Sequence, residues 1–160
     1  MKKPHKVAVI SGSSKGIGLG LAKKFLKKNY RVLINSRNYK HLNTVYKDLK
    51  IKFPNRVIMV CGDISEKNTL KNIEKRILKK WNRIDVLIAN AGDISNKNKN
   101  NKSWLINKNF LTSKKFIDYF YQYLIKTEGS IILISSIVAL IKTNAPIGYT
   151  ISKKLINNYG

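Results

Sequence analysis

The amino-acid sequence predicts an α/β fold in which a doubly wound parallel sheet carries helices on both of its faces. Five short apolar segments alternate with longer amphipathic segments along the 160 residues, which is typical of strand–helix repeats. The short segments are almost continuously apolar, as expected for parallel strands that are buried on both sides. A glycine-rich turn follows the first of them directly, and most of the other links are short.

The spacing of the apolar residues predicts the individual elements. Runs rich in β-branched residues predict strands at Lys6–Ser11, Arg31–Ser36, Arg56–Val60, Ile84–Ala89 and Ser130–Ser135. Apolar residues three or four positions apart predict helices over residues 17–26, His41–Ile51, Ile64–Trp81, Ser103–Lys126 and from Tyr149 onward. The pair Pro54–Asn55 ends the second helix. The segment Asp93–Lys102 is polar, and its tract Asn96–Lys102 predicts a solvated, mobile loop.

Composition excludes several classes of protein. Hydrophobic residues make up 43% of the chain, which is enough for a packed core. The longest apolar stretch, Ile131–Ile141, contains two serines and is shorter than the roughly 20 residues that a membrane span needs. The basic N-terminus precedes only a short apolar run, unlike a secretory signal. One cysteine, Cys61, excludes an intramolecular disulfide, and two histidines add little towards a zinc site. We therefore expect no metal and a cytoplasmic location.

The charge is strongly positive, with 32 Lys and Arg residues against 8 Asp and Glu residues and a formal net charge of +24. Such a field attracts nucleic acid or an anionic membrane surface. The alternative is compositional drift, because lysine, asparagine and isoleucine share A/T-rich codons and the lysines are spread over every predicted helix. Drift is favoured, so we expect no specific nucleic-acid partner and no membrane partner.

The first motif is the glycine-rich turn Ser11–Gly18, which lies between the first strand and the first helix. Its glycines, Gly12, Gly16 and Gly18, have the spacing G-x-x-x-G-x-G. Glycines at such a turn let a pyrophosphate approach the helix N-terminus, where free N–H groups and the helix dipole favour an anion. The alternative is an ordinary turn between a strand and a helix.

Polar residues follow two other predicted strands. Asp63 comes just after the third strand, and Asn90-Ala91-Gly92 ends the fourth. In open α/β sheets, ligands bind at the carboxyl ends of the strands. In the alternative interpretation Asn90 bonds a loop backbone, and Asp63 caps the next helix, since Asp63-Ile64-Ser65-Glu66 has capping-box spacing.

A third group of residues, Ser136, Tyr149 and Lys153, carries chemistry near the C-terminal end. Tyr149 and Lys153 are four positions apart and share a helix face. A nearby ammonium group favours the phenolate form, which makes a tyrosine usable as a proton donor or acceptor. A serine hydroxyl at the end of the neighbouring strand can hold a reacting oxygen. The alternative is an exposed helix face that carries both side chains by chance.

Together these motifs resemble those of the short-chain dehydrogenase/reductase family, in particular its 3-oxoacyl-carrier-protein-reductase-like members. The family's T-G-x-x-x-G-I-G appears as Ser11–Gly18, and its N-A-G as Asn90-Ala91-Gly92. The family's catalytic serine lies thirteen residues before its tyrosine, which selects Ser136 over Ser135. Its catalytic asparagine matches Asn109, and Asn107 is the second choice.

The resemblance implies a Rossmann-type fold and an oxidoreductase that interconverts a small carbonyl compound and a secondary alcohol by hydride transfer. Tyr149 would be the general acid, and Lys153 would support it and bond the nicotinamide ribose. Ser136 would orient the substrate oxygen, and Asn109 would hold a water in a proton relay. Asp63 would bind the adenine. The implied cofactor-binding residues are Gly12, Ser14, Lys15, Gly16, Ile17, Gly18, Arg37, Asp63, Ile64, Asn90, Ala91, Gly92, Tyr149 and Lys153.

The end of the second strand indicates the choice of cofactor. Family members that prefer NAD usually carry an acidic residue there, whereas this strand ends Asn35-Ser36-Arg37. Arg37 can pair with a 2′-phosphate, and Lys15 is a second cation within reach. The sequence therefore predicts NADP, with NADPH favoured over NADH.

The chain departs from the family in length. Members usually have about 250 residues in one domain, whereas this sequence ends inside the helix that carries Tyr149 and Lys153. We expect residues 1–160 to form a single Rossmann-type NAD(P)-binding domain with five strands, lacking the C-terminal strands and the substrate-binding segment. The full-length parent is expected to be a homo-oligomer. The alternative function is a truncated, inactive remnant that at most binds nucleotide or another chain.

Overall fold

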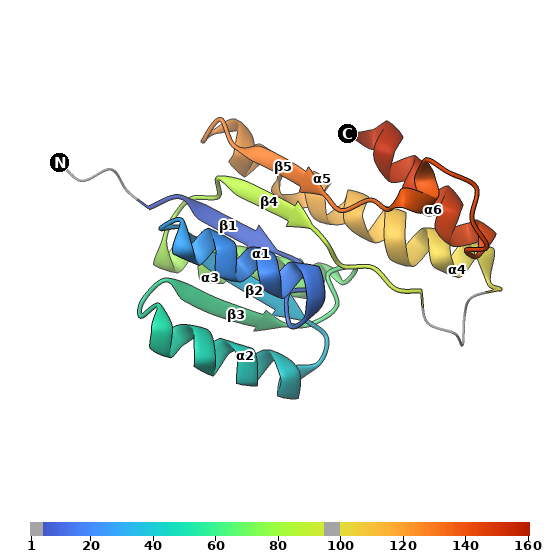
Figure 1. Cartoon of the computed structure of the whole chain (residues 1–160). Helices are drawn as coiled ribbons and strands as arrows, with labels where there is room; N and C mark the ends of the chain where they lie inside the picture. Colours follow the sequence, from blue (N-terminus) through green and yellow to red (C-terminus); the bar gives the residue numbers. More distant parts are fainter. Residues whose placement is uncertain (1–4, 95–99) are drawn as a thin grey trace.

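The computed structural model describes residues 5–94 and 100–160, and it contains a five-stranded parallel sheet with the strand order β3-β2-β1-β4-β5 (Figure 1). The strands are β1 Val7–Ile10, β2 Arg31–Ser36, β3 Val57–Cys61, β4 Val86–Ala89 and β5 Ser130–Leu133. All five predicted strands are confirmed, and their bounds differ by no more than two residues at either end.

Helices connect the strands and cover the sheet. Their bounds are α1 Gly16–Lys27, α2 Tyr39–Lys52, α3 Lys67–Lys80, α4 Lys102–Ile106, α5 Thr112–Ile125 and α6 Ile147–Tyr159. A π-helical segment, Asn107–Leu111, joins α4 to α5, and a short 3₁₀ turn, Ile137–Ala139, follows β5. None of the helices in the described parts of the chain is both long and apolar enough to cross a bilayer.

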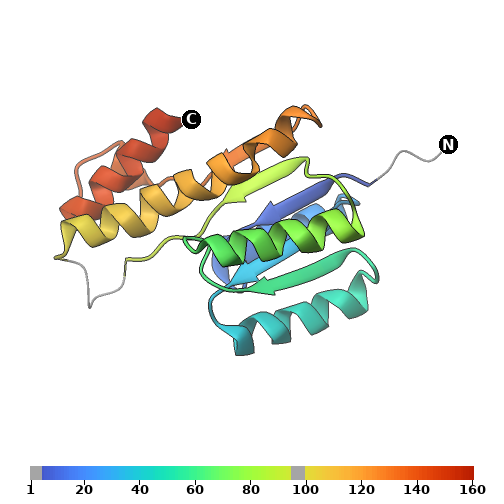
Figure 2. The same cartoon turned by 180° about the vertical axis from the view of Figure 1, so that it is seen from behind.

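Two separate cores lie on the two faces of the sheet. Successive side chains of a strand point to opposite faces, so β1 contributes Val7 and Val9 to one core and Ala8 and Ile10 to the other. Helices α3 and α5 cover the first core, and α1 and α2 cover the second (Figures 1 and 2). The predicted doubly wound, Rossmann-like architecture is therefore confirmed.

The strand order places a topological switch point at β1 and β4, which are neighbours in the sheet. From β1 the chain runs outward to β2 and β3, and it then returns to place β4 on the opposite side of β1. The connections after β1 and β4 therefore leave in opposite directions, and the carboxyl ends of these two strands form the topological switch point, where open α/β sheets bind ligands.

A buried carboxylate holds the other ends of these two strands together. Asp85, just before β4, accepts a hydrogen bond of 2.7 Å from the backbone N–H of Val7 in β1. The guanidinium of Arg83 donates to both carboxylate oxygens of Asp85, at 2.9 and 2.5 Å. Since Asp85 is only 4% exposed, its charge is paired and its oxygens are satisfied. This arrangement fixes the register of β1 against β4.

The structure corrects two helix boundaries. The third helix begins at Lys67 and not at Ile64, because Asp63 accepts hydrogen bonds from the N–H and hydroxyl of Ser65 in a tight turn before it. The residue at the N-cap position is Glu66, so the interpretation of Asp63 as the helix cap was wrong. The single helix predicted over Ser103–Lys126 is interrupted by the π-helical segment.

Residues 96–99 of the predicted mobile tract Asn96–Lys102 lie outside the described residues. Asn101 is the N-cap of α4, since its side chain accepts a hydrogen bond of 2.9 Å from the N–H of Trp104, and Lys102 is the first residue of that helix. The end of the tract is therefore part of a capped helix.

Two glycines of α1 provide a matched test of the packing beneath the turn. A Cβ on Gly18 would lie 2.5 Å from both Asn90 Nδ2 and the Gly12 carbonyl oxygen, whereas a Cβ on Gly20 would meet nothing within 4 Å. We expect Gly18→Ala to lower the free energy of unfolding by about 1–3 kcal/mol through overpacking. We expect Gly20→Ala to raise it by about 0.5–1 kcal/mol through helix propensity. Chemical denaturation of the two variants checks this, and a stable Gly18→Ala protein would contradict it.

Candidate functional site

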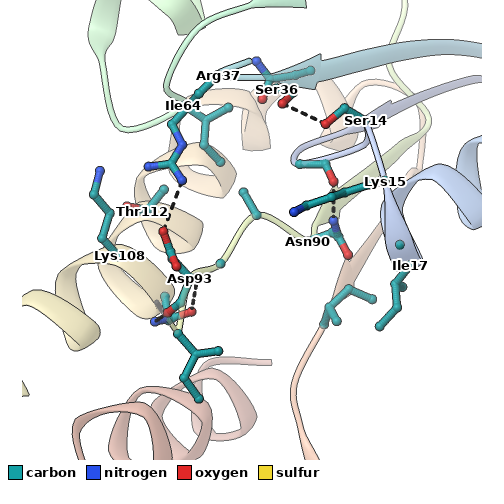
Figure 3. A pocket seen from close by; sticks show the side chains of 18 of the residues that line it. Ser14, Lys15, Ile17, Ser36, Arg37, Ile64, Asn90, Asp93, Lys108 and Thr112 are labelled. Atoms are coloured by element: carbon teal, nitrogen blue, oxygen red, sulfur yellow. Dashed lines mark hydrogen bonds and ion pairs between the residues drawn. The ribbon is translucent and has the colours of Figure 1, made fainter. Parts of the chain in front are cut away.

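A cavity of about 500 Å³ opens at the carboxyl ends of the strands, over the switch point (Figure 3). Every site residue predicted from the sequence lines this cavity except Gly18, which lies beneath it, packed against Asn90 and Gly12. The lining residues that were predicted are Gly12, Ser14, Lys15, Gly16, Ile17, Arg37, Asp63, Ile64, Asn90, Ala91, Gly92, Asn109, Ser136, Tyr149 and Lys153.

The glycine-rich turn forms one wall of the cavity, and two of its glycines adopt left-handed backbone conformations. Gly12 has φ +62° and Gly16 has φ +54°. A Cβ on Gly12 would lie 2.9 Å from the Cα of Ala91, so this glycine lets the turn pack against the segment after β4. A Cβ on Gly16 would meet nothing within 4 Å, and this residue lines the cavity. The backbone at the start of α1 is therefore accessible to an anion, as a pyrophosphate site requires.

Asn90 fixes the shape of this turn. Its side-chain amide donates to the carbonyl oxygens of Ser11 at 3.0 Å and Gly12 at 2.9 Å. In return, the hydroxyl of Ser11 accepts hydrogen bonds of 3.0 Å from the N–H groups of Asn90 and Ala91. Asn90 therefore bonds the backbone of a neighbouring loop, as the alternative interpretation of the sequence expects, and that loop is the glycine-rich turn.

Four charged side chains surround the end of the cavity beside β2 and β3. Arg37 lies 3.2 Å from Asp93 and 3.9 Å from Asp63, and the ammonium of Lys108 lies 2.9 Å from Asp63. Burial by itself would raise the pKa of Asp63, but Lys108 and the hydrogen bonds from Ser65 lower it to about 2. This end of the cavity therefore holds two carboxylates and two cations that form ion pairs with one another. Next to it, the hydroxyl of Ser14 donates to the hydroxyl of Ser36 at 2.9 Å.

The opposite end of the cavity holds Tyr149 and Lys153. Both side chains come from α6, and the ammonium of Lys153 lies 5.6 Å from the centre of the Tyr149 ring. The same ammonium donates a hydrogen bond of 2.7 Å to the carbonyl oxygen of Ile134. Lys153 is only 6% exposed, and this burial lowers its pKa from 10.5 to about 8. The side chain of Lys153 is therefore mostly protonated at pH 7, and its positive charge lies beside Tyr149.

Two serine hydroxyls lie between β5 and α6, and their partners differ. The hydroxyl of Ser135 donates to the backbone carbonyl of Lys153 at 3.3 Å, which joins the strand end to the helix. The hydroxyl of Ser136 accepts a long hydrogen bond, 3.5 Å, from the N–H of Val138. Both serines line the cavity.

Asn109 lies in the π-helical segment and is 1% exposed. Its amide group donates to the carbonyl oxygens of Asp93 and Leu105, both at 2.8 Å, and its side-chain oxygen accepts from the N–H of Asp93 at 3.0 Å. The carbonyl of Leu105, one turn back, thus bonds a side chain at the point where the helix widens. Asn107, the second choice, is exposed and is absent from the cavity lining, whereas Asn109 is part of it.

Sequence reasoning missed several residues of this cavity, of which Asp93 and Lys108 carry charge. Asp93 directly follows Asn90-Ala91-Gly92, so its position after a strand end was a usable signal. The sequence held no such signal for Lys108, because it is one of many lysines and its direction depends on the π-helical segment. The missed lining residues also include Asn35, Ser36, Gly62, Ile94, Thr112, Ile134 and Ser135.

The fold and the switch-point cavity together define a Rossmann-like α/β protein. The model of the family described as short chain dehydrogenase matches residues 6–159. The chain therefore belongs to the short-chain dehydrogenase family.

Individual relatives agree with this membership. A dehydrogenase/reductase SDR family protein 7-like from Dictyostelium discoideum is 29% identical over 97% of this chain and 52% of its own length. The 3-oxoacyl-acyl-carrier-protein reductase FabG of Buchnera aphidicola is 32% identical over 96% of this chain and 64% of its own length. A solved short-chain dehydrogenase/reductase of unknown function from Caenorhabditis elegans, with cofactor, has a TM-score of 0.88 and 25% identity over 98% of this chain and 62% of that one. The chain thus spans between about half and two thirds of the length of these relatives.

Burial of Lys153 predicts a pH dependence of stability. Burial disfavours the protonated ammonium of Lys153, so the folded state binds that proton less tightly than the unfolded state does. The contribution of Lys153 to the free energy of unfolding is therefore most favourable above pH 10.5, and the favourable part is lost as the pH falls to about 8. Between pH 7 and 9.5 the free energy of unfolding should rise by about 2 kcal/mol relative to Lys153→Met, which lacks this group. Lys154→Met, at the exposed next position, is the control and should keep the rise. Urea titrations at the two pH values measure it, and parallel behaviour of all three proteins would refute the burial argument.

Proposed function

We propose that this chain is the cofactor-binding part of an NADPH-dependent oxidoreductase that interconverts a carbonyl group and a secondary alcohol. One observation carries the proposal. A single cavity extends from the glycine-rich turn and Arg37 at one end to Tyr149 and Lys153 at the other. Such a cavity suits an extended dinucleotide whose reactive ring lies beside a proton donor. The family membership supports the same chemistry.

The residues of the cavity fit the parts of this cofactor. The turn that contains Gly12 and Gly16 would hold the pyrophosphate, Asp63 and Ile64 the adenine, and Lys153 the nicotinamide ribose. When bound, the cofactor supplies or accepts the hydride. The accessible backbone at Gly16 is the feature of this structure that fits the phosphates, because no side chain covers it and any other residue would be strained at φ +54°.

Proton transfer would be the work of the chain's own side chains. Tyr149 would donate the proton to the carbonyl oxygen during reduction, and Ser136 would hold that oxygen by a hydrogen bond. The ammonium of Lys153, 5.6 Å from the tyrosine ring, would stabilise negative charge on the phenol oxygen. Asn109, buried in the cavity wall, would help to hold the water that returns a proton to the site.

The preference for NADPH rests on the end of β2. Ser36 and Arg37 stand where a carboxylate would select NAD, and both line the cavity together with Lys15. A guanidinium group can pair with a phosphate through two hydrogen bonds, which adds geometric specificity to the charge. Lys15 is exposed at the N-cap position of α1 and would add a second positive charge.

The second candidate function is nucleotide binding without turnover. It would need only the glycine-rich turn and the charged end of the cavity beside β2 and β3, and both are formed by described residues of this chain. Turnover of NADPH with a panel of carbonyl compounds, measured beside NADPH binding, separates the two candidates, because the second predicts binding alone.

We also infer that the whole protein is a homo-oligomer. This inference is supported by exposed apolar side chains in and just before α5, namely Leu111, Tyr121 and Ile125.

Replacing Arg37 tests the choice of cofactor. We expect Arg37→Asp to weaken NADPH binding by about 1.5–3 kcal/mol, because a charge-assisted contact to the 2′-phosphate is lost, and to leave NADH binding much less affected. Lys47→Asp makes the same change of charge on an exposed position of α2, outside the cavity, and should alter neither. Dissociation constants for both nucleotides decide the point. An unchanged NADPH preference would remove Arg37 from the proposal.

Replacing Tyr149 tests the proton donor. We expect Tyr149→Phe to reduce kcat by about 10²–10⁴-fold while NADPH still binds, because only the hydroxyl supplies the proton. Tyr121→Phe removes a hydroxyl from an exposed residue of α5 and should leave kcat unchanged. Steady-state rates and cofactor binding are measured on both variants. If Tyr149→Phe kept a tenth of the activity, another group would be the main acid.

A further inference from the structure

We propose that Asp93 is a specificity-determining residue for the cofactor, because its carboxylate holds Arg37 and so competes with a 2′-phosphate for the same guanidinium. This inference rests on the proposed binding of NADP. Arg37 and Lys15 would create the preference for NADPH over NADH, and Asp93 would limit it.

The ion pair between Arg37 and Asp93 crosses the cavity. Arg37 follows β2, Asp93 comes a few residues after β4, and β1 lies between these two strands in the sheet. The nearest guanidinium nitrogen of Arg37 and a carboxylate oxygen of Asp93 are 3.2 Å apart, and Figure 3 shows the two side chains reaching toward each other. Both residues line the cavity, so the contact lies at the site itself.

Asp93 is a stronger partner for Arg37 than Asp63 is. Asp63 lies 3.9 Å from Arg37, and its carboxylate already accepts hydrogen bonds from Lys108 at 2.9 Å and from the hydroxyl of Ser65 at 2.7 Å. The pair with Asp93 is shorter, and it meets hydrogen-bond geometry. Opposite charges attract more strongly at the shorter distance. Asp93 is therefore the main competitor for the guanidinium.

The two partners differ in freedom, which decides which of them must move. The backbone of Asp93 is fixed by Asn109, whose side chain bonds both its N–H at 3.0 Å and its carbonyl at 2.8 Å. The side chain of Asp93 is 26% exposed, whereas the long side chain of Arg37 is 57% exposed. A phosphate would therefore draw Arg37 away from a carboxylate that stays in place, and it would meet the negative charge of that carboxylate nearby.

The ion pair with Asp93 would lower the affinity only for nucleotides that bind through Arg37. A nucleotide with a 2′-phosphate gains its charge-assisted contact only by taking Arg37 from Asp93, so part of the gain is cancelled. A nucleotide with a 2′-hydroxyl has no need of Arg37, and it does not pay for breaking the pair. Removing the charge of Asp93 should therefore strengthen the binding of 2′-phosphorylated nucleotides alone.

The experiment compares Asp93→Asn with the unsubstituted chain, using adenosine 2′,5′-bisphosphate and 5′-AMP as probes in titration calorimetry at fixed ionic strength. These probes need only the adenosine half of the site. We expect Kd for the bisphosphate to fall by about 2–5-fold, as for loss of a partly exposed ion pair, and Kd for 5′-AMP to stay the same. Asp48→Asn removes the same charge from an exposed position of α2 and should change neither Kd.

A double-variant cycle shows whether Asp93 acts through Arg37. In an Arg37→Gln background, Asp93→Asn should give a clearly smaller gain, because no guanidinium remains to be released and only the direct repulsion between carboxylate and phosphate is relieved. An unchanged or weaker Kd for the bisphosphate, an equal gain for 5′-AMP, an equal effect of Asp48→Asn, or a gain of the same size without Arg37 would each overturn the inference. If the unsubstituted chain binds neither probe, the proposed function fails and this inference fails with it. Thermal melts confirm that each variant is folded.

Discussion

The pairing of β1 with β4 is the constraint on which the rest of the structure depends. Because β4 returns to the opposite side of β1 from β2, the loops after these strands leave in opposite directions and open the cavity. At one end of the pair, Asp85 bonds the backbone of Val7 and fixes the register. At the other end, Asn90 bonds the backbone of Ser11 and Gly12. The site is therefore built on two strands that are joined by side-chain hydrogen bonds beyond both of their ends.

Asn109 connects the two ends of this site. Its side chain takes up the carbonyl of Leu105 within its own helix and both backbone groups of Asp93, at the point where the helix widens into a π-helical turn. The same arrangement places Lys108 against Asp63. A single buried amide in the cavity wall thus helps to position the charged groups beside β2 and β3. The π-helical segment that carries Asn109 also packs against α6, the helix of Tyr149 and Lys153. A substitution of Asn109 would therefore disturb both ends, so loss of activity in such a variant would not by itself identify a catalytic role.

The excess of positive charge has a local exception. Two of the eight acidic residues, Asp63 and Asp93, lie at one end of the cavity, each beside a cation. Most lysines are exposed, whereas Lys153 is buried, and no salt bridge in the described parts of the chain includes it. Burial without a counter-ion lowers the pKa of Lys153, while Asp63, with Lys108 beside it, is held as an anion. The site therefore contains two charged groups, Lys153 and Asp63, whose surroundings differ from those of the solvated surface.

The sequence by itself determined the fold class and the five strands, because apolar periodicity is a local property. Much of the cavity lining was expected because strand ends gather at one edge of a parallel sheet and because the motifs resemble those of a known family. That resemblance also supplied the choice of Asn109 over Asn107, and of these two residues Asn109 is the one that is buried and lines the cavity. The tertiary structure alone decided the start of α3, the π-helical turn and the pairing of Arg37 with Asp93. Each of these depends on groups that are distant in sequence or on competition between hydrogen-bond partners. Among the many lysines, the spacing to Tyr149 had already marked Lys153 in the sequence, whereas only the folded arrangement separates Lys108 from the solvated remainder.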